Sequence, residues 1–501
     1  MHLEFPKIFP VTAHTDHVGP GTTFVAVQGL KQNGIDYITQ ALDKGASKIV
    51  VQEDAVLPNA VLEQLNKHHV SLLRVPNTRR ALAELSAQAL NYPARKLKII
   101  GITGTKGKTT TSFILAHLLY SAGYSTALLS TIRNRINDQE FATALTTQQP
   151  DYLHVFLDLC VRAEVTHVVM EVSAQALSMN RLAGIEFDGA IFTNFSQEHA
   201  EFYPTLDDYF NAKKLLFSSL KSTARPCINV DDEYGMQIFK QRMLENKKTT
   251  AFFYTAALLG LDTRADVHAE LVQANKHGIE FIMHTPEHEI RIHCPSLIGT
   301  YNLYNVLGAA TVALQNKVQP EVIKQAMTTF KGVPGRMESY PLANGALCVI
   351  DYAHTPSSFQ AILTTLRSMT DHLIVVFGCG GDRDPIKRPA MGRIAAELGD
   401  LIFVTSDNPR SEELPTIIAQ IESGIAPDYQ AKVRRELDRE QAIKKAYASA
   451  RSGSIIVLLG KGPDEYEEVK GVKRYFSERQ IILEMGATIG AKSPLQKVSD
   501  H

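Results

Sequence analysis

The sequence lacks a net charge of either sign. Lys and Arg total 52 and Asp and Glu total 53 in 501 residues, which leaves a formal charge of −1. Proteins that bind nucleic acid commonly carry a marked basic excess, because the phosphate backbone attracts cations. We therefore expect no nucleic acid as the main partner.

Three further features are scarce or missing. The cysteines are only five, scattered, and without the paired spacing of a metal site. This usage favours a reducing compartment. The N-terminal residues lack a basic start followed by an apolar stretch, so we expect no signal peptide. No run of about 18 apolar residues exists to span a membrane. We expect a cytoplasmic protein with no membrane partner.

The length exceeds what one hydrophobic core usually organises, so several domains are expected. Two loop-like stretches, at residues 91–94 and 331–335, interrupt the pattern of strands and helices. We therefore predict three α/β domains, covering residues 1–94, 95–334 and 335–501.

Apolar strands and amphipathic helices alternate in the second and third regions. The helix predicted at 109–122 has apolar residues at helical spacing and is followed by Gly123, a residue that suits a helix end. This alternation is typical of parallel sheets covered by helices on both faces, whose sites lie at the carboxyl ends of the strands. The predicted strands are 23–27, 48–51, 97–103, 166–172, 189–193, 227–230, 347–351, 373–377, 401–405 and 454–459.

A glycine-rich turn between strand 97–103 and helix 109–122 predicts a phosphate-binding loop. Glycines let the backbone wrap closely around phosphate oxygens, and a helix N-terminus offers free N–H groups. Lys108 would then pair with the β and γ phosphates of a nucleotide, and the Thr109 hydroxyl would bind Mg²⁺. The match to the general pattern is imperfect, because Ile102 stands where a glycine is usual, and a turn that binds nothing is the alternative. The loop residues are Gly104, Thr105, Lys106, Gly107, Lys108, Thr109 and Thr110.

With several further motifs, in order along almost the whole chain, this loop resembles the Mur ligase family. The motifs cover residues 170–173, 193–199, 212–213, 302–305, 334–338 and 351–356. The resemblance implies an N-terminal domain for a UDP-linked substrate, a central ATP-binding domain and a Rossmann-like C-terminal domain for the incoming amino acid. It departs at Lys106, where the family commonly has Asn.

The resemblance also implies the reaction. The γ-phosphoryl group of ATP moves onto a substrate carboxylate, and the amine of an amino acid then attacks the acyl phosphate. Phosphoryl transfer needs mainly positioning and charge neutralisation. Lys108, Lys213 and His199 are the implied catalytic residues. The implied Mg²⁺ ligands are Thr109, Glu171, His199 and Lys213, of which Lys213 would be carbamylated.

Each of these residues has a structural alternative. Glu171 could cap a helix or pair with an arginine, and His199 could be a hydrogen-bonded structural histidine. Lys213 and Lys214 are adjacent on a predicted helix, so they point about 100° apart and only one can face a site. The family motif favours Lys213; the alternative for both is a solvated helix face.

The resemblance assigns further residues to ligands. Asn302 is expected near adenine, and Arg336 and Asp351 near the phosphates and ribose, with an interdomain ion pair or hinge contact as their alternative. The residues matched to the nucleotide-sugar substrate are Thr15, Thr146, Thr147, Ser173 and Arg181. Thr15 is the weakest match, because residues 14–16 depart from the family pattern, as does the stretch 146–150.

Within the family, the third region is similar to enzymes that add a diamino acid to UDP-N-acetylmuramoyl-L-alanyl-D-glutamate in peptidoglycan synthesis. The motifs are residues 378–384, 387–389, 407–410 and 460–462. Asp407-Asn408-Pro409-Arg410 implies meso-diaminopimelate, whose second carboxylate Arg410 would hold through two hydrogen bonds. The residues matched to the amino acid are Arg388, Asp407, Asn408, Arg410, Gly460 and Asp464.

Several alternatives stay open from the sequence. Pro463 and Asp464 depart from the family pattern, so L-lysine is an alternative amino acid. A folylpolyglutamate-synthase-like ligase, a nucleotide-binding protein without catalysis and a P-loop kinase or GTPase are the other readings. The motifs around 378–384 and 407–410 argue against the first, and the retained Lys108, Glu171, His199 and Lys213 against the second. The missing guanine-specificity motif argues against the third. The sequence leaves the oligomeric state open.

Overall fold

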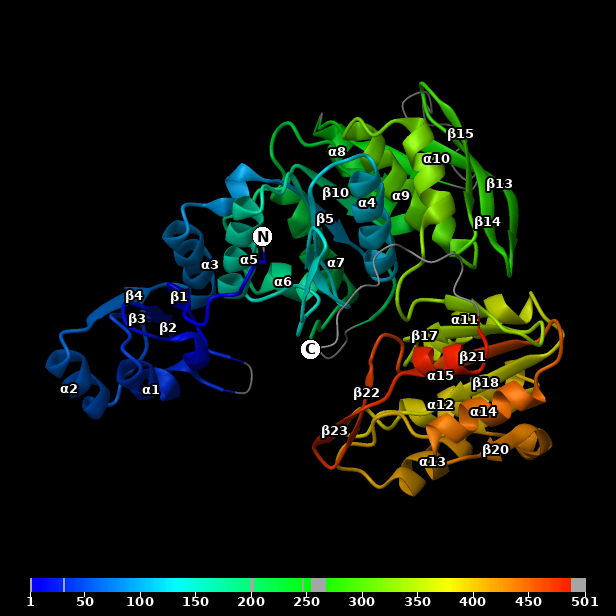
Figure 1. Cartoon of the computed structure of the whole chain (residues 1–501). Helices are drawn as coiled ribbons and strands as arrows, with labels where there is room; N and C mark the ends of the chain where they lie inside the picture. Colours follow the sequence, from blue (N-terminus) through cyan, green and yellow to red (C-terminus); the bar gives the residue numbers. More distant parts are fainter. Residues whose placement is uncertain (1, 30–31, 199–201, 246, 254–266, 488–501) are drawn as a thin grey trace. The chain divides into compact units, whose positions relative to one another are not determined.

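A computed structural model describes residues 2–29, 32–198, 202–245, 247–253 and 267–487. The chain divides into two compact units (Figure 1). The first comprises residues 1–271, 281–292 and 301–327, and the second comprises 272–280, 293–300 and 328–501. Each unit is described by itself below.

The N-terminal part of the first unit is a small parallel sheet with helices on both faces. Its strands are β1 (Val11–Thr12), β2 (Thr23–Val25), β3 (Lys48–Gln52) and β4 (Ser71–Val75), in that order. Because successive side chains in a strand point to opposite faces, Phe24 and Ile49 pack in one apolar cluster and Val25 and Val50 in another. Helices α1 (Ile38–Asp43) and α2 (Asn59–Lys67) supply the first cluster, and α3 (Thr78–Ala89) the second.

A long sheet follows, in the order β15-β14-β13-β12-β11-β10-β5-β9-β6-β7-β8. The strands from β12 to β6 in this order run parallel, whereas β7 and β8 pair antiparallel at one edge. The bounds are β5 (Lys98–Thr103), β6 (Thr126–Leu129), β7 (Asn134–Ile136), β8 (Gln139–Phe141), β9 (His167–Glu171), β10 (Gly189–Phe192), β11 (Cys227–Asn229), β12 (Thr250–Phe253), β13 (Val267–Asn275), β14 (Gly278–His284) and β15 (Glu289–Cys294).

Helices cover the parallel part of this sheet, and α4 packs against α9. The parallel strands are buried on both faces, which explains their unbroken apolar sequences. The helices are α4 (Lys108–Ser121), α5 (Pro150–Arg162), α6 (Ala174–Ser178), α7 (Leu206–Ser218), α8 (Glu233–Leu244), α9 (Tyr301–Gln315) and α10 (Pro320–Thr329).

The second unit contains a six-stranded sheet in the order β16-β17-β21-β18-β19-β20, parallel except for β16. Val375 packs in one apolar cluster with α11, α12 and α13, and Ile374 and Val376 pack in another with α14 and α15. The strands of this sheet are β16 (Glu338–Pro341), β17 (Leu347–Asp351), β18 (Leu373–Phe377), β19 (Leu401–Val404), β20 (Val433–Arg435) and β21 (Ile455–Leu459). A separate antiparallel hairpin consists of β22 (Tyr466–Val469) and β23 (Val472–Tyr475). The helices are α11 (Pro356–Arg367), α12 (Lys387–Leu398), α13 (Leu414–Glu422), α14 (Arg439–Ser449) and α15 (Glu478–Glu484).

The predicted α/β fold class is confirmed, and β17 and β18 begin and end at the predicted residues. Helix α4 ends beside Gly123, which has a φ of 85°. The sequence did not predict β13 to β15 or the β22–β23 hairpin. Contacts give two units where the sequence predicts three domains, and the bounds at 94 and 334 stay a prediction.

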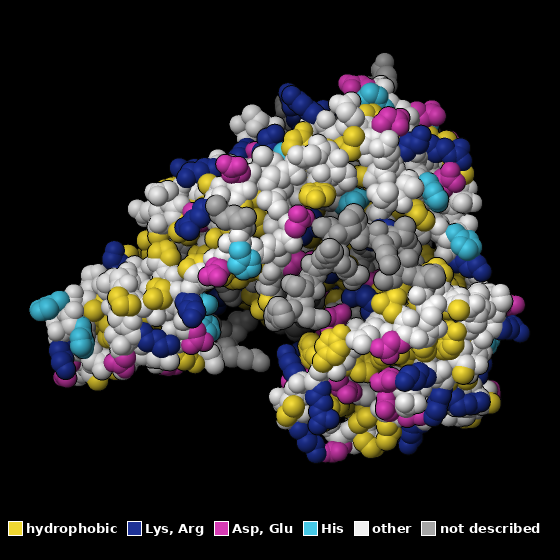
Figure 2. All heavy atoms as spheres, viewed as in Figure 1, with side chains coloured by type: hydrophobic (Ala, Val, Ile, Leu, Met, Phe, Trp, Pro, Cys, Tyr) yellow, Lys and Arg dark blue, Asp and Glu magenta, His cyan; other side chains and the backbone are white. Residues whose placement is uncertain are grey.

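Basic and acidic side chains are interspersed on the face shown in Figure 2, as the near-zero net charge leads one to expect. Within the described residues, no helix combines the length and apolar character needed to cross a membrane.

Candidate active site

The phosphate loop lies at the carboxyl edge of the long sheet, together with the segments that follow two neighbouring strands. β5 pairs with β9 and β10 in parallel, with Ile102 opposite Glu171 and Thr103 opposite Phe192. Carboxyl ends of adjacent parallel strands meet at one edge, where α/β proteins place their ligands. The loop 104–107, Glu171 and Thr193 are therefore neighbours by topology.

Two loop positions require glycine. Gly104 has a φ of 148°, and a Cβ atom there would lie 2.0 Å from Oγ1 of Thr193. Gly107 has a φ of 83° at the start of α4, and a Cβ atom there would lie 2.3 Å from Oδ1 of Asn305. Any side chain at either position would force the backbone away from its supports.

Thr193 and Asn194 hold the loop in shape. The Asn194 carbonyl accepts the Thr105 N–H at 2.8 Å, and Asn194 Oδ1 accepts the Lys106 N–H at 2.9 Å. Thr193 Oγ1 donates to the Lys106 carbonyl at 2.7 Å. Both residues belong to the motif at 193–199, but no role was predicted for them from the sequence. Their position directly after a strand was the signal that could have identified them.

Lys108 and Lys213 converge on one carbonyl oxygen. Lys108 Nζ donates to the carbonyls of Gly104 at 2.9 Å and Thr105 at 2.8 Å, and Lys213 Nζ donates to the same Gly104 carbonyl at 2.7 Å. Lys213 is 1% exposed. Its burial, together with the positive charge of Lys108, holds the pKa of Lys213 well below its ordinary value, and Glu198 opposes this shift only in part. The site thus favours the uncharged amine of Lys213.

The two adjacent lysines of α7 differ as helical geometry requires. Lys213 is buried, with its Nζ 4.4 Å from the ring centroid of Tyr209. Lys214 is partly exposed and lies 5.6 Å from the ring centroid of Phe210. Only Lys213 reaches the phosphate loop.

Glu171 and Thr109 form an oxygen-rich corner beside the loop. Glu171 is fully buried, and its Oε2 accepts from Thr109 Oγ1 at 2.9 Å and from Thr131 Oγ1 at 3.1 Å. The Thr131 N–H donates to Oε1 at 2.9 Å. Carboxylate and hydroxyl oxygens are the donors that Mg²⁺ prefers, so this pair fits the predicted metal.

The predicted metal ligand His199 lies outside the described residues. Among residues that are described, no group of three or more His, Cys, Asp or Glu side chains is arranged to hold a metal ion. Thr109 and Glu171 are therefore the described residues whose oxygens fit Mg²⁺, an ion that keeps several water and phosphate ligands.

Asn302 lies one helical turn from Asn305 at the start of α9, and both are buried. Asn305 Nδ2 donates to Asn302 Oδ1 at 2.8 Å, and Asn305 Oδ1 accepts from Thr111 Oγ1 at 3.2 Å. This chain of contacts brings Asn302 close to the helix that begins at the phosphate loop, as its predicted role at the nucleotide requires.

Four residues predicted to contact the nucleotide-sugar substrate form one cluster. Thr147 Oγ1 donates to the Glu171 carbonyl at 2.9 Å and lies 3.3 Å from Ser173 Oγ, and Arg181 donates to the Thr147 carbonyl at 2.9 Å. Thr146 joins through its hydroxyl, which accepts from Thr131 at 3.1 Å. The cluster therefore adjoins the Glu171 corner.

Thr15 is not part of this cluster. It lies in a short 3₁₀ helix, Thr15–His17, where its carbonyl accepts from Lys44 Nζ at 2.9 Å. The segment just before this turn is tied to α5 by Asp151, whose Oδ2 accepts from Thr12 Oγ1 at 2.7 Å and from the Ala13 N–H at 3.2 Å. Sequence reasoning missed Asp151, which directly follows the stretch 146–150.

Arg336 and Asp351 lie together in the second unit. Asp351 is buried, and its two oxygens accept the N–H groups of Met337 and Ala353, each at 2.8 Å. Burial raises the pKa of Asp351, and the charge of Arg336 opposes that shift. The Arg336 guanidinium lies 5.1 Å from the ring centroid of Tyr352.

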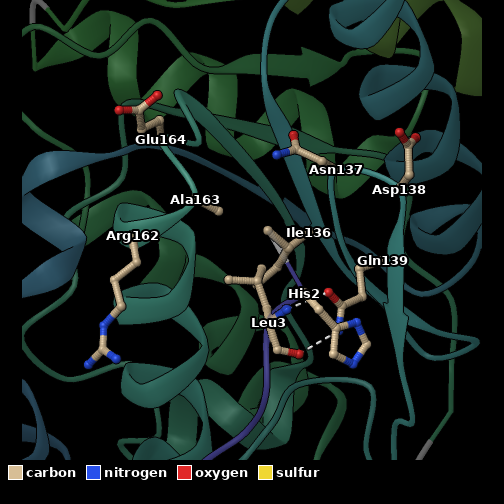
Figure 3. Close-up of a pocket in the computed structure, with 9 residues that line it drawn as sticks. All are labelled: His2, Leu3, Ile136, Asn137, Asp138, Gln139, Arg162, Ala163 and Glu164. Carbon is tan, nitrogen blue, oxygen red and sulfur yellow. Dashed lines mark hydrogen bonds between the residues drawn. The ribbon is translucent and has the colours of Figure 1, made fainter.

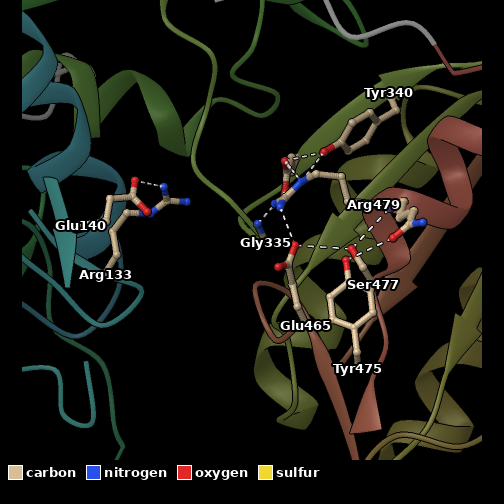
Figure 4. Close-up of polar contacts among 10 residues, drawn as sticks. Arg133, Glu140, Gly335, Tyr340, Glu465, Tyr475, Ser477 and Arg479 are labelled. Atoms are coloured by element: carbon tan, nitrogen blue, oxygen red, sulfur yellow. Dashed lines mark hydrogen bonds and ion pairs between the residues drawn. The ribbon is translucent and has the colours of Figure 1, made fainter. Parts of the chain in front are cut away.

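A polar network holds the segment before Arg336 (Figure 4). Glu338 accepts the Gly335 N–H at 2.8 Å and the Arg479 guanidinium at 2.9 Å. Arg479 also bonds to the Tyr340 hydroxyl at 2.8 Å and to Glu465 at 3.2 Å. Helix α15 thus fixes the start of β16.

The predicted amino-acid pocket is built where β18, β19 and β21 end. Gly381 donates its N–H to the Asn408 carbonyl at 2.9 Å, and a Cβ atom at Gly381 would lie 1.9 Å from the Pro409 carbonyl. A Cβ atom at Gly378 would lie 2.4 Å from the Thr405 carbonyl. The glycines of 378–381 are therefore explained by close packing against the loop 405–410.

The acidic side of this pocket contains Asp407, Gly460 and Asp464. Gly460 has a φ of 111°, and a Cβ atom there would lie 2.3 Å from Asp407 Oδ2. Burial raises the pKa of Asp464, and the nearby Asp407 carboxylate raises it further. Two neighbouring carboxylates suit the ammonium group of an amino acid.

The basic side consists of Arg410, whose side chain contacts the glycine loop, residues 378–381. Its Nη1 donates to the Gly381 carbonyl at 2.8 Å, and its Nε lies 3.5 Å from Glu468 Oε2. Asn408 supports this side, because its Oδ1 accepts from Lys461 Nζ at 3.1 Å and from the Glu468 N–H at 2.9 Å.

Arg388, another residue predicted to bind the amino acid, lies near the N-terminus of α12. Its side chain is fully buried, and its guanidinium bonds to Glu412 at 2.7 and 2.9 Å, to Gln420 at 2.6 Å and to the Gly380 carbonyl at 3.0 Å. These acceptors hold Arg388 under the glycine loop. Its predicted role in binding the amino acid stays a prediction.

A hollow of about 810 Å³ lies elsewhere, between the N-terminal residues, the β7–β8 hairpin and the end of α5. Figure 3 shows the Arg162, Glu164 and Asp138 side chains pointing away from one another around the apolar Leu3 and Ile136. None of the predicted site residues lines it.

Comparisons with known proteins show the family of this chain. Three family descriptions match the chain: "Mur ligase family, catalytic domain" at 10–89, "Mur ligase middle domain" at 102–313 and "Mur ligase, glutamate ligase domain" at 335–462. A UDP-N-acetylmuramoyl-L-alanyl-D-glutamate–2,6-diaminopimelate ligase of Clostridium botulinum is 37% identical over 93% of each chain. A ligase of the same name from Cytophaga hutchinsonii is 37% identical over 94% of this chain and 93% of its own.

Solved structures share the fold. A UDP-N-acetylmuramoyl-L-alanyl-D-glutamate–2,6-diaminopimelate ligase superposes with a TM-score of 0.67 at 28% identity, covering 95% of this chain and 94% of its own. The MurF ligase of Thermotoga maritima, solved in complex with ADP, has a TM-score of 0.60 at 18% identity, covering 95% of this chain and 96% of its own. With the three family matches and relatives of this identity, the chain belongs to the Mur ligase family.

Proposed function

We propose that this chain is an ATP-dependent ligase that joins meso-diaminopimelate to UDP-N-acetylmuramoyl-L-alanyl-D-glutamate through an acyl phosphate. One observation carries the proposal: Lys108 and Lys213 meet at the carbonyl of Gly104, in a phosphate loop beside the buried Glu171. The chain's identity to ligases with this printed activity supports the choice of substrates.

The phosphate loop and Lys108 bind and orient the polyphosphate of ATP. Lys108 Nζ rests on two loop carbonyls, so it is already held at the start of α4 where the phosphates of a nucleotide bind. ATP supplies the phosphoryl group that makes the substrate carboxylate reactive. The positive charge of Lys108 stabilises the charge that develops on that group.

Thr109 and Glu171 are the residues that would hold Mg²⁺, which neutralises phosphate charge when bound. Their oxygens are already 2.9 Å apart, and Thr131 fixes the Glu171 carboxylate from the other side. Thr147 and Ser173 adjoin the same corner, so they would position the UDP-linked substrate beside the phosphates.

Lys213 is proposed to carry a carbamate. The uncharged amine attacks CO₂, a nitrogen–carbon bond forms as one carbon–oxygen π bond opens, and one proton leaves to solvent, which converts the neutral amine into an anion. Burial and the charge of Lys108 favour the uncharged amine that this reaction needs. The resulting anion would lie beside Lys108 and could help to hold Mg²⁺.

In the second unit, Asp407 and Asp464 would bind the ammonium group of the incoming amino acid, and Arg410 its far carboxylate. Asn408, Gly460 and Arg388 are proposed to belong to the same pocket, and Arg388 also bonds to the glycine loop. Arg336 and Asp351 are proposed at the phosphates and ribose of ATP, and Asn302 at adenine. Thr15 and Arg181 are proposed at the UDP-linked substrate.

L-Lysine is the second candidate for the added amino acid. Glu468 favours it, because this carboxylate already lies against Arg410, the cation that would select a second substrate carboxylate.

A coupled assay tests the proposal. Purified protein is supplied with the UDP-linked dipeptide, ATP, Mg²⁺ and a panel of amino acids, and phosphate release is measured together with the mass of the product. We expect release with meso-diaminopimelate and none with Lys108→Ala, which removes a charge and no core side chain. Absence of turnover with every amino acid, or full turnover by a folded Lys108→Ala protein, would overturn the proposal.

A further inference from the structure

Strand β22 completes the predicted amino-acid pocket by pairing with the loop that carries Arg410. The Arg410 N–H donates to the Glu468 carbonyl at 3.0 Å, and the Lys470 N–H donates to the Arg410 carbonyl at 2.7 Å. Arg410 has a φ of 51°, in the left-handed region that residues other than glycine seldom adopt. Backbone pairing with β22 therefore holds Arg410 in an unusual conformation beside Glu468.

The side chains of Arg410 and Glu468 also meet. Arg410 Nε lies 3.5 Å from Glu468 Oε2, and the two side chains are only 19% and 22% exposed. The Glu468 N–H is itself fixed by Asn408 at 2.9 Å. The contact therefore lies between two partly buried groups on fixed backbone, where solvent screens charge less than at an open surface.

This contact bears on the binding of a second carboxylate. A guanidinium has five N–H donors, and in Arg410 the Gly381 carbonyl accepts from Nη1 while Glu468 lies beside Nε. An incoming carboxylate must displace Glu468 or bind the rest of the fork with a like charge nearby. Either arrangement reduces the affinity of the incoming carboxylate for Arg410, because carboxylates that share one site repel each other.

We propose that Glu468 is a specificity-determining residue whose carboxylate competes with the far carboxylate of the incoming amino acid for Arg410. This inference rests on the proposed function, because it assumes that Arg410 faces the far end of that amino acid. Glu468 lowers the affinity for an amino acid with a carboxylate at that end and leaves one without it unaffected. It thereby narrows the preference for meso-diaminopimelate over L-lysine.

The test compares wild type with Glu468→Gln, which keeps the shape of the side chain and removes its charge. We expect the KM for meso-diaminopimelate to fall roughly three- to thirty-fold, after allowing for partial solvent screening of the repulsion. The KM values for L-lysine and ATP should stay within about twofold, because neither ligand places a carboxylate against Arg410.

Glu413→Gln is the matched control. Glu413 lies near the same hairpin, 3.2 Å from Lys470, with both side chains 70% exposed. Its loss changes the net charge equally but removes no partner of Arg410, so the KM for meso-diaminopimelate should not change. An equal fall in both variants would assign the effect to general charge and overturn the inference.

The two proposals fail in different ways. If wild type ligates a diamino acid but Glu468→Gln leaves the KM for meso-diaminopimelate unchanged or raises it, the inference about Glu468 is overturned and the ligase function stands. A rise would mean that Glu468 orients Arg410 for the substrate. If no diamino acid is ligated by wild type or variant, the proposed function falls and the inference falls with it.

Discussion

At the scale of single residues, the surroundings of a side chain matter more than its type. Lys213 and Lys214 are chemically identical and adjacent, yet only Lys213 is buried beside a second cation. Desolvation and the like charge of Lys108 both disfavour the protonated form of Lys213, whereas the Lys214 side chain is partly exposed.

We predict that Lys213→Ala abolishes ligation and that Lys214→Ala retains activity within about twofold, because surface changes away from a site have small effects. If the lost group is a carbamate anion, short carboxylic acids should restore part of the activity of Lys213→Ala. Phosphate release with and without added acetate measures this. Equal activity of both variants, or an unmodified Lys213 in the mass spectrum of active enzyme, would contradict the carbamate.

The proposed role of Arg410 in binding the amino acid can also be tested by substitution. Arg410→Ala should raise the KM for meso-diaminopimelate by tens- to thousands-fold, the effect of about 2–5 kcal/mol for a lost buried charge pair. The KM for ATP should stay unchanged, and the preference over L-lysine should shrink. The measurement is kcat/KM for both amino acids on both proteins. A wild type that already prefers lysine would refute the choice of diaminopimelate.

At the scale of elements, α14 holds the ends of two strands that build the amino-acid pocket. Arg439 begins α14 and donates to the Ser406 carbonyl after β19 and to the Leu459 carbonyl at the end of β21, each at 2.9 Å. It also pairs with Glu478 of α15 at 2.7 Å, and both side chains are buried. Sequence reasoning missed Arg439, which belongs to no motif.

We predict that Arg439→Met destabilises the protein by about 3–5 kcal/mol, because it leaves Glu478 buried without its cation. The double variant Arg439→Met/Glu478→Leu should recover much of that loss, since no lone charge remains. Both variants should raise the KM for the amino acid, because the Ser406 and Leu459 carbonyls lose their shared donor. Urea unfolding and kinetics measure these effects; a double variant no more stable than the single one would contradict the charge argument.

At the scale of the whole molecule, the predicted nucleotide contacts are divided between the two compact units. The phosphate loop and Asn302 belong to the first unit, and Arg336 and Asp351 to the second. Ligand contact reduces local opening of the backbone, so the proposed roles can be tested in each unit separately.

We predict that a non-hydrolysable ATP analogue slows amide hydrogen exchange at residues 104–113 and also at 335–353. Hydrogen exchange followed by mass spectrometry, with and without the analogue, measures both segments. Protection confined to 104–113 would contradict the proposed roles of Arg336 and Asp351 and favour the alternative, an ion pair or hinge contact without ligand.

The sequence alone determined the local features. The strand before the phosphate loop, the helix after it and the glycines within it were predictable because they depend on neighbouring residues, apolar periodicity and backbone sterics. The same holds for β17 and β18, whose unbroken apolar sequences reflect burial on both faces. Membership of the Mur ligase family was likewise predictable, because ordered motifs are a property of the sequence.

Only the tertiary structure decided which distant side chains meet. Arg388 bonds to Glu412 and Gln420, which lie 24 and 32 residues away in the sequence. Glu468 contacts Arg410 because β22 pairs with a loop more than 50 residues earlier in the chain, a register that no local pattern encodes. Charge partners are selected by strand order and register, which depend on the packing of the whole sheet.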